Sequence, residues 1–323
     1  MAVSVEPRCS GCGNYVDEDD LFCGNCGRAV ESAGAAQGAI EQGFVGFDCR
    51  NCGASMTFDI EQKGLRCAFC GSISLQKQDQ PTGRIKPEYY IPFTITRDSA
   101  AVRFREWIGR GFFRPFGIEK QAAVVEMRPV YLPFWVFAGR AHTYFAGDSS
   151  QTPAFARANW CPVFGEREDE LKDILVPASG SLTPEEVTAI SPYASSAAKP
   201  YSREDLKEFV VEDFGVSRRG ARPMARKLMT ESMLAAAAGM IPGNHRNVHV
   251  NPIFTDLRAA PALLPVWINA YQFRGKTYRF LVNGQTGEVV GTAPFSYVKL
   301  LLVLLAIAVI AVLAMVLFSS GRV

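Results

Sequence analysis

Eight of the nine cysteines lie within the first 70 residues, where they form four repeats of the pattern CxxCG. Ten residues separate the first two repeats, fourteen separate the last two, and a 22-residue gap divides the pairs. A CxxC turn places two thiolates on one side of a tight loop, and two such loops can close a tetrahedron around a borderline-soft divalent ion. The predicted ligand sets are Cys9, Cys12, Cys23 and Cys26, and Cys49, Cys52, Cys67 and Cys70.

Zinc fits an all-cysteine tetrahedron best, so the spacing predicts two zinc ions, one in each set. The glycine after each pair can adopt positive φ and turn backbone N–H groups toward the sulfur atoms. Disulfides, rubredoxin-like iron and a redox dithiol remain as alternatives. Disulfides are disfavoured because MAVSVEPRCSG carries no secretion signal, and a dithiol because every CxxC has a matched partner. Since protein ligands fill all four positions, we expect structural ions without a catalytic water.

The charge of the cysteine segments argues against binding to nucleic acid, which requires Lys and Arg side chains that neutralise phosphates. The whole chain carries a formal net charge of only +2. Residues 1–31 hold two basic and six acidic side chains, and residues 44–80 hold four of each. A protein partner therefore fits these segments better, and nucleic acid stays the alternative.

A run of nineteen apolar residues, Leu300–Phe318, contains no charge, proline, glycine or hydroxyl. As a helix it would span about 28 Å, close to the thickness of the hydrocarbon layer of a bilayer. Tyr297 and Lys299 lie where residues that anchor a span at the membrane surface are found. Only five residues follow, so the sequence predicts a tail-anchored, single-pass protein of the cell membrane. Reduced, metal-loaded cysteines favour the cytosol for the N-terminal bulk.

The segment between the cysteines and the apolar run contains a weak internal repeat. YLPFWVFAGRAHTYFAGD at 131–148 shares an LPxW core and a later Thr-Tyr with LLPVWINAYQFRGKTYRFLVNGQTGE at 263–288. Each copy alternates bulky residues around a turn, which predicts antiparallel strands, and each follows a helical stretch. In the second copy FRGKTY is expected to form a first turn and NGQTGE a second. The second helix is expected to begin at Pro223, which suits a first turn. We therefore expect two helix-plus-hairpin halves, with Trp135 and Trp267 in the core rather than in a ligand groove.

No motif of enzymatic chemistry stands out in this segment, so we expect a protein that is not an enzyme. RGKT at 274–277 lacks the glycine that a nucleotide-binding loop needs at position 270, and a strand follows it. His245 and His249 lie on one apparent strand, and Cys161 fits a buried thiol. TPEE at 183–186 and SRED at 202–205 predict helix N-caps, and GEREDELKD at 165–173 predicts a solvated loop.

One local basic cluster, SRRGARPMARK at 217–227, contains five basic side chains and no acidic one. If it is helical from Pro223, it is amphipathic, with Met224 and Leu228 on one face. Three interpretations remain open: a solvated helix end, contact with anionic lipid headgroups, and binding to nucleic acid. The residues assigned to lipid contact are Arg219, Arg222 and Arg226.

These motifs together resemble a bacterial family of membrane-anchored zinc-ribbon proteins. The resemblance rests on the paired CxxC ribbons, the YLPFW strand, the late block running from LPVW through GKTY to VNGQTGEV, and the C-terminal span. It covers most of the chain from Phe44 onward. Members are often labelled as similar to the cysteine-rich region of the primosomal replication-restart helicase, or as containing a transcription-factor-IIB-type zinc ribbon. Such labels concern the ribbon alone.

The sequence as a whole predicts an α+β protein with two small N-terminal zinc ribbons, a pseudo-repeat domain of helices and antiparallel sheet, and one C-terminal transmembrane helix. Its expected role is a non-enzymatic interaction or scaffold module, and a membrane-tethered nucleic-acid-associated factor is the alternative. The expected segments are ribbon 1 at 1–30, a flexible linker at 31–43, ribbon 2 at 44–80, an α+β domain with two LPxW half-repeats at 84–294, the membrane helix at 298–318 and a short tail at 319–323.

Overall fold

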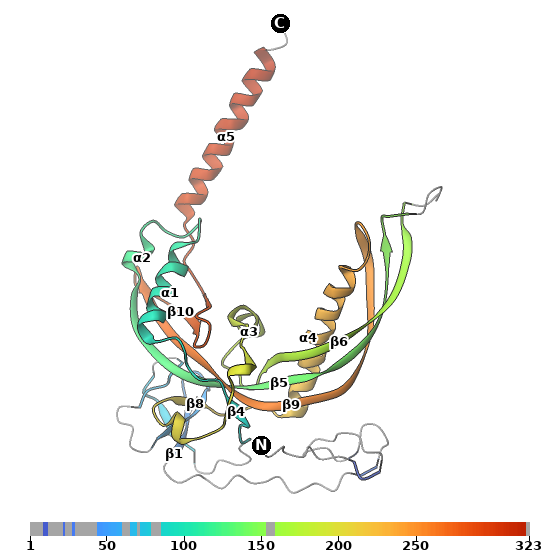
Figure 1. The fold of residues 1–323 in the computed structure, drawn as a ribbon. Coiled ribbons are helices and arrows are strands. Elements are labelled where there is room, and N and C mark those ends of the chain that lie inside the picture. Colours follow the sequence, from blue (N-terminus) through green and yellow to red (C-terminus); the bar gives the residue numbers. More distant parts are fainter. Residues whose placement is uncertain are drawn as a thin grey trace. The chain divides into compact units, whose positions relative to one another are not determined.

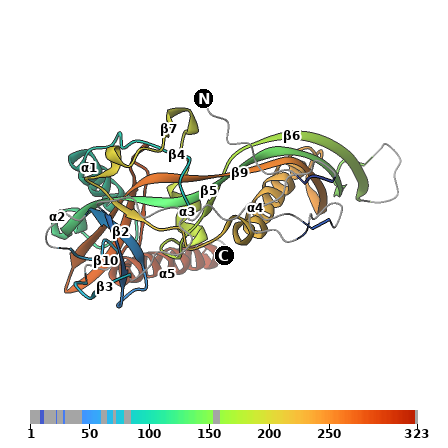
Figure 2. The same ribbon diagram turned by 90° about the horizontal axis from the view of Figure 1, so that it is seen from below.

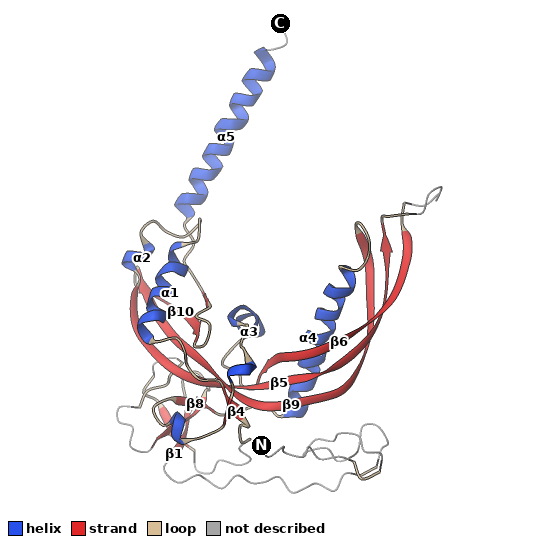
Figure 3. Cartoon of the chain, viewed as in Figure 1, coloured by secondary structure: helices blue, strands red, loops and turns tan. Residues whose placement is uncertain are grey.

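The computed structural model of the chain describes residues 9–11, 22, 28–29, 44–59, 65–69, 72–78, 85–152 and 159–320. It is a mixed α+β structure, as predicted, in which helices accompany very long strands (Figure 3). The expected linker at 31–43 lies outside the described residues. The elements in chain order are β1 (Phe44–Cys49), β2 (Ser55–Asp59), β3 (Leu75–Lys77), β4 (Tyr89–Tyr90), α1 (Arg97–Gly109), α2 (Ile118–Gln121), β5 (Ala123–Ser149), β6 (Cys161–Pro177), α3 (Pro184–Ile190), two short 3-10 helices (Ser195–Ala197 and Glu204–Leu206) on either side of β7 (Lys199–Pro200), β8 (Val210–Glu212), α4 (Arg218–Ala238), β9 (His245–Phe273), β10 (Lys276–Asn283), β11 (Val289–Gly291) and α5 (Tyr297–Ser320).

Two compact units make up the chain, and each is assembled from separate stretches of sequence. The chain passes between the units five times, and two of these points lie inside its two longest strands, β5 and β9. Unit 1 comprises Met1–Pro92, Val130–Thr188 and Pro192–Pro265, and unit 2 comprises Phe93–Pro129, Ala189–Ser191 and Val266–Val323.

The long hairpin of β5 and β6 forms the frame of unit 1. Phe134 pairs with Pro177 at one end and Ser149 with Cys161 at the other, so the antiparallel ladder is nearly continuous. The register shifts once, next to Gly139. A Cβ atom at Gly139 would lie 3.1 Å from the backbone of Leu257 in β9, so the close approach of the two strands favours glycine at this position.

Helix α4 lies along the concave side of β5, β6 and β9 in unit 1 (Figures 1 and 2). Its buried side chains recur every fourth residue, which produces one narrow stripe of small and flexible apolar groups. The stripe packs against Trp135, Phe137 and Leu171 on the strands. The buried residues of the helix are Ala221, Ala225, Met229, Met233 and Ala237.

The predicted start of α4 at Pro223 is wrong, because the helix begins at Arg218. Ser217 is its N-cap, and the Ser217 hydroxyl accepts a hydrogen bond from the N–H of Gly220 at 3.2 Å. Pro223 lies inside the helix instead, where its ring removes one backbone donor. A serine cap therefore outweighed the proline as the signal for the helix start.

Unit 2 has the same components as this part of unit 1, arranged around the hairpin of β9 and β10. Thr96 caps α1, and its hydroxyl accepts from the N–H of Ser99 at 3.3 Å. The buried residues of α1, which are Ala100, Phe104 and Ile108, again recur every fourth position. Phe104 stacks on Phe280 of β10 with ring centroids 3.9 Å apart. The hydrophobic core of unit 2 therefore lies between α1 and this hairpin.

Both turns predicted in the second repeat copy are confirmed. Arg274 and Gly275 join β9 to β10 with φ values of 50° and 75°, the left-handed geometry of a tight hairpin turn. In the next turn the side-chain oxygen of Asn283 accepts from the backbone N–H groups of Gln285 and Thr286 at 2.8 and 3.0 Å. That bonding fixes the turn before β11.

The turn predicted in the first copy is wrong, because β5 runs unbroken from Ala123 to Ser149. The predicted loop GEREDELKD is also wrong, since it lies inside β6. Residues 165–170 alternate in exposure along this strand, with Glu166, Glu168 and Glu170 on the exposed face. Pairing with β5 along its whole length outweighs the low strand propensity of these charged residues.

Each of the two helices, α1 and α4, packs on the hairpin of the copy that it does not directly precede in sequence. The indole N–H of Trp135 donates to the carbonyl oxygen of Val216 at 2.8 Å, and that of Trp267 donates to Ile95 at 3.0 Å. Each acceptor directly precedes a helix N-cap, that of α4 or of α1. The expected pairing of each helix with the hairpin that follows it is therefore wrong, and the helices are exchanged.

The two predicted N-caps have different outcomes. At TPEE the cap is confirmed: the N–H of Thr183 donates to the Glu186 carboxylate at 3.0 Å, and the N–H of Glu186 donates to the Thr183 hydroxyl at 3.2 Å. At SRED the predicted cap is wrong, since Arg203 precedes the short 3-10 helix there and no side chain caps it.

One helix in the described part of the chain, α5, is long and apolar enough to cross a membrane. The candidate span is Tyr297–Met315, and none of it is buried against the rest of the protein. This agrees with the predicted C-terminal apolar helix, which begins a few residues after the edge strand β11 of unit 2.

Candidate metal centre

The second cysteine segment folds as a three-stranded antiparallel ribbon with β1 at its centre. Asp48 of β1 pairs with Ser55 of β2 and with Gln76 of β3. The Asp48 carboxylate accepts hydrogen bonds from the Ser55 hydroxyl at 2.6 Å and from the amide of Gln78 at 2.7 Å. These contacts hold the ends of all three strands together beside the cysteines.

Three cysteines converge at this end of the ribbon. The Sγ atoms of Cys49, Cys52 and Cys67 all lie within 4.8 Å of one another, and those of Cys52 and Cys67 are 3.5 Å apart. That separation is too long for a disulfide bond of about 2.05 Å. Cys49 and Cys67 are buried, whereas Cys52 is exposed. Three sulfur atoms of the predicted second set therefore surround one point, and Cys70 lies outside the described residues.

Backbone hydrogen bonds shape the turn that carries the first two of these thiols. The N–H of Gly53 donates to the Cys49 carbonyl at 2.8 Å, and the N–H of Cys49 donates to Ala54 at 2.9 Å. Gly53 has φ of 76°, which confirms the positive φ expected for the glycine of this CxxCG repeat. The N–H of Arg50 donates to the Ser74 carbonyl at 3.0 Å, so this turn is joined to the segment after Cys67.

The geometry of the thiols fits a metal ion. A tetrahedral ion with metal–sulfur bonds of about 2.3 Å requires sulfur atoms about 3.8 Å apart, close to the separations in the cluster. Thiolates also bind soft and borderline ions well, and hard ions such as Mg²⁺ poorly. The Cys49, Cys52 and Cys67 cluster could therefore hold a metal ion.

The ribbon is joined edge to edge with the sheet of unit 1. Met56 and Thr57 of β2 pair with Glu212 and Val211 of β8, and β8 in turn pairs with β5. The Thr57 hydroxyl also donates to the Asp213 carboxylate at 2.9 Å. The buried Glu212 accepts hydrogen bonds from the hydroxyls of Ser179 and Ser181. The cysteine cluster therefore lies on a ribbon that is hydrogen-bonded to the body of the unit, a connection that the sequence did not reveal.

Little of the first cysteine set is described. Cys9 is buried, and its sulfur accepts a hydrogen bond from the N–H of Gly11 at 3.3 Å. Phe22 and Ala29 form an antiparallel bridge. A hydrogen bond from a backbone N–H to sulfur is the contact expected at a thiolate that binds a metal ion. The other members of this set, Cys12, Cys23 and Cys26, lie outside the described residues.

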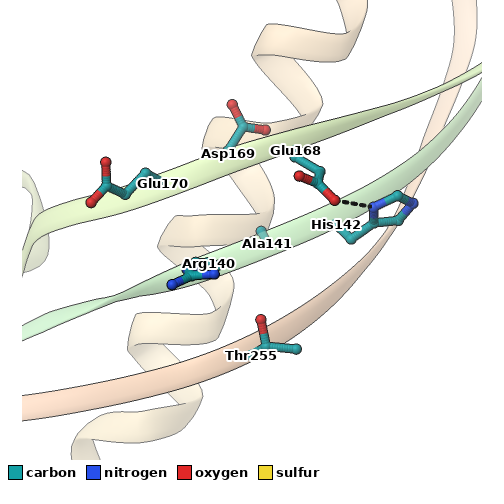
Figure 4. A pocket seen from close by; sticks show the side chains of 7 residues that line it. All are labelled: Arg140, Ala141, His142, Glu168, Asp169, Glu170 and Thr255. Carbon is teal, nitrogen blue, oxygen red and sulfur yellow. Dashed lines mark hydrogen bonds and ion pairs between the residues drawn. The ribbon is translucent and has the colours of Figure 1, made fainter.

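A polar hollow of about 500 Å³ opens on the strands of unit 1 (Figure 4), and sequence reasoning missed it. Side chains from β5, β6 and β9 line it, and they carry charges of both signs. The sequence did carry one signal for the hollow: Glu166, Glu168 and Glu170 alternate with other residues, as the side chains on one face of a strand do. The lining residues are Arg140, Ala141, His142, Glu168, Asp169, Glu170 and Thr255.

His142 is the titratable centre of this hollow. Its Nδ1 lies 3.3 Å from the Glu168 carboxylate, and its Nε2 lies 3.1 Å from that of Glu166. The hydrogen bond with Glu168, followed by that with Glu166, raises the pKa of His142 above its ordinary value of 6.5. The ring also contacts Tyr144 edge to face, with centroids 4.7 Å apart. Both ring nitrogens therefore face carboxylates, and these favour the protonated, charged form of the ring.

The other residues singled out in the sequence are not gathered into one site. His245 and His249 are exposed on β9, and Cys161 is half-buried at the start of β6. In the basic cluster, the Arg218 guanidinium lies 5.5 Å from the ring centroid of Trp135, and that of Arg226 lies 5.7 Å from Phe254. These two arginines therefore cover apolar surface of unit 1.

Comparison with known proteins gives one relative and no function. An uncharacterized protein of Bacillus subtilis (strain 168), YdjG, is 25% identical over 312 residues, and the match covers 78% of this chain and 91% of the relative. No protein-family profile matches the chain, and no solved structure matches it. The similarity therefore extends along most of both chains without naming a ligand, a reaction or a partner.

Proposed function

We propose that the chain is a tail-anchored membrane protein that holds zinc in its cysteine ribbons and presents unit 1 to a protein partner at the cytosolic face. The observation that carries the proposal is the convergence of Cys49, Cys52 and Cys67 on a ribbon that is paired with the sheet of unit 1. An ion at this place would stabilise the sheet edge. With Cys70 as the fourth ligand, it would have no open position for catalysis.

Zinc is the ion that suits these ligands, and two ions per chain follow from the two cysteine sets. The buried sulfur of Cys9, with its bond from the Gly11 N–H, supports a second site in the first segment. Elemental analysis of the purified full-length protein should give two zinc ions per chain. One ion per chain, or mainly iron, would contradict the assignment.

A protein partner is favoured by a second surface of unit 1, on the strands β5 and β6. The hollow around His142 offers closely spaced donors and acceptors of both charges, and the exposed Phe164 and Tyr144 lie on the strands that carry it. Aromatic residues and arginine are enriched at protein interfaces, and polar groups such as those of the hollow suit the rim of an interface. The open form of the hollow fits a side chain of a partner better than a small-molecule substrate that must be shielded from water.

A partner that depends on the metal-loaded ribbon can be tested with matched cysteine variants. The solubilised full-length protein should recover the same partner in the wild-type and Cys161→Ser forms, and lose it in the Cys49→Ser form. Recovery that is equal in all three forms would show that the ribbon plays no part in binding. Recovery of no specific partner by wild type would contradict the interaction role.

The basic cluster at the start of α4 allows the nucleic-acid and lipid alternatives to be tested with one set of substitutions. The Arg219, Arg222 and Arg226 side chains would contact anionic headgroups under the lipid interpretation. Replacing these three by Gln should leave binding to DNA, RNA and anionic vesicles unchanged if the cluster is a solvated helix end. Affinity that falls steeply with salt and is lost in the variant would instead identify a phosphate-binding surface.

A further inference from the structure

The base of α5 carries a group of aromatic side chains that the sequence analysis did not bring together. Three belong to the loop between α1 and α2, and two immediately precede or begin α5. In Figure 1 this loop lies beside the lower end of α5. We call the group the aromatic collar, and its members are Phe112, Phe113, Phe116, Phe295 and Tyr297.

Ring contacts join four of the five collar residues, and Phe116 contacts Lys299 at the start of α5. Phe113 stacks on Phe295 with centroids 5.3 Å apart, and it contacts Phe112 edge to face at 5.1 Å. Phe295 contacts Tyr297 at 5.4 Å. A backbone hydrogen bond joins the same two segments, since the N–H of Ser296 donates to the carbonyl of Phe113 at 2.7 Å. The loop is therefore fixed to the first turn of α5, although nearly 180 residues separate them in sequence.

Much of the apolar surface of the collar is not covered by the rest of the protein. The exposed fractions are 68% for Phe112, 67% for Phe116 and 77% for Tyr297. The neighbouring Arg114 turns inward instead: its guanidinium lies 4.2 Å from the centroid of the Trp107 ring and donates to the Trp107 carbonyl. Within Phe112–Phe116 the charged residue thus packs against unit 2 and the phenylalanines are left outside, the reverse of an ordinary solvated segment.

One positive charge borders the collar at the height where a membrane surface would lie. The Lys299 ammonium is 4.2 Å from the ring centroid of Phe116. Lysine and aromatic rings at the end of an apolar helix are the residues that occupy the boundary between headgroups and hydrocarbon. If α5 crosses the bilayer, the residues bonded to its first turn must lie at the same depth.

From this we infer that the aromatic collar is a second membrane contact, in which Phe112 and Phe116 enter the interfacial layer beside the base of α5. The inference rests on the proposed membrane insertion of α5 and adds to it. A single helix leaves a protein able to rotate and tilt about one point. The collar adds contacts away from the helix axis, and it therefore sets which face of unit 2 is directed toward the lipid.

The test uses the full-length protein in phosphatidylcholine vesicles, with tryptophan placed at one exposed phenylalanine at a time. The variants are Phe112→Trp, Phe116→Trp and, as the matched control on β6 of unit 1, Phe164→Trp. The fluorescence that each new tryptophan adds to that of wild type is recorded, and its quenching is measured with two reagents. One is lipid brominated near the top of the acyl chain, and the other is acrylamide in the aqueous phase. Wild type supplies the background of the four native tryptophans.

We expect brominated lipid to quench at least half of the added fluorescence at positions 112 and 116, while acrylamide has little effect. Phe164→Trp should show the opposite pattern. Strong acrylamide quenching at 112 and 116, in protein that carbonate does not extract, would overturn the inference and leave the anchor intact. Protection from both quenchers would overturn it in favour of a second protein copy or a partner on the collar. Protein that carbonate strips from the vesicles would overturn both the anchor and the collar.

Discussion

Cys49 and Cys67 are almost completely buried, whereas Cys52 is open to solvent, so the three thiols should not be equivalent in a cysteine-to-serine series. Serine at position 49 should remove one of the two zinc ions and open residues 44–78 to proteolysis, because metal binding supplies on the order of 10 kcal/mol to the folding of such ribbons. The check is zinc content together with limited proteolysis.

Cys161→Ser is the matched control for this series, since it removes a thiol of unit 1 that lies outside the cluster. It should keep both ions and the wild-type digestion pattern. Full zinc occupancy in Cys49→Ser would mean that the ribbon does not use this residue as a ligand.

His142 gives a second prediction at this scale, because its charge depends on two identified carboxylates. Its pKa lies above 6.5 chiefly through Glu168, so Glu168→Gln should move the pKa back toward that value. The chain has only three histidines, so histidine-selective NMR labelling resolves the titration, and His142→Gln assigns its signal.

The sign of the linked stability change follows from the raised pKa. A histidine whose folded pKa is raised contributes its stabilisation fully below its unfolded pKa, near 6.5, and loses it as pH rises through the folded value. Wild type and Glu168→Gln should therefore differ most in unfolding midpoint below pH 6.5, and converge once the pH has risen through the folded pKa. A difference that grows with pH would show that Glu168 stabilises unit 1 in some other way.

At the scale of elements, the sequence predicted the local features and missed how they combine. Periodic apolar positions identified α1 and α4, the capping box at TPEE identified the start of α3, and Gly275 identified the β9–β10 turn. The exchange of the helices was hidden because it depends on contacts between distant segments, such as the Trp135 indole and the Val216 carbonyl. Likewise, the sequence did not predict β6, because its charged residues have low strand propensity and are held in a strand by pairing with β5.

The helix exchange makes a specific prediction about energetic coupling. Trp135→Phe removes a hydrogen bond to the residue before the α4 cap, and Ser217→Ala removes the cap itself at a cost of about 1 kcal/mol. Since these groups are neighbours, the double variant should deviate from additivity by more than about 0.5 kcal/mol. The same holds for Trp267→Phe combined with Thr96→Ala. Urea unfolding in detergent measures all four single changes and their pairs.

The crossed pairs are the control for this cycle. Trp135→Phe with Thr96→Ala, and Trp267→Phe with Ser217→Ala, join residues of different units that share none of the described hydrogen bonds. Their effects on the free energy of unfolding should add to within about 0.5 kcal/mol. Coupling in the crossed pairs, but not in the matched ones, would favour helices that pack on their own copies.

At the scale of the whole molecule, the question is which side of the membrane carries the ribbons. Lys299 and Arg322 flank the apolar run on opposite sides, so local positive charge leaves the orientation open, and the proposed cytosolic side rests on the expectation of reduced, metal-loaded cysteines. Protease added to intact cells should spare the N-terminal bulk and digest it once the cells are opened. Digestion in intact cells would place the ribbons outside.

The attachment itself should follow the energetics of a buried apolar helix. The fourteen Leu, Ile, Val and Phe residues of Leu300–Phe318 together favour insertion by about 4–8 kcal/mol, and an arginine at the centre of a span costs about 2.5–3.5 kcal/mol. Val309→Arg should therefore weaken resistance to carbonate extraction, and Val309→Arg with Ile310→Arg should abolish it. Val298→Arg places the same charge at the expected membrane surface and should have little effect. Truncation after Pro294 removes α5 entirely and should give a soluble protein. Equal extraction of the central and the surface variants would show that α5 is held by protein contacts rather than by the hydrocarbon of the bilayer.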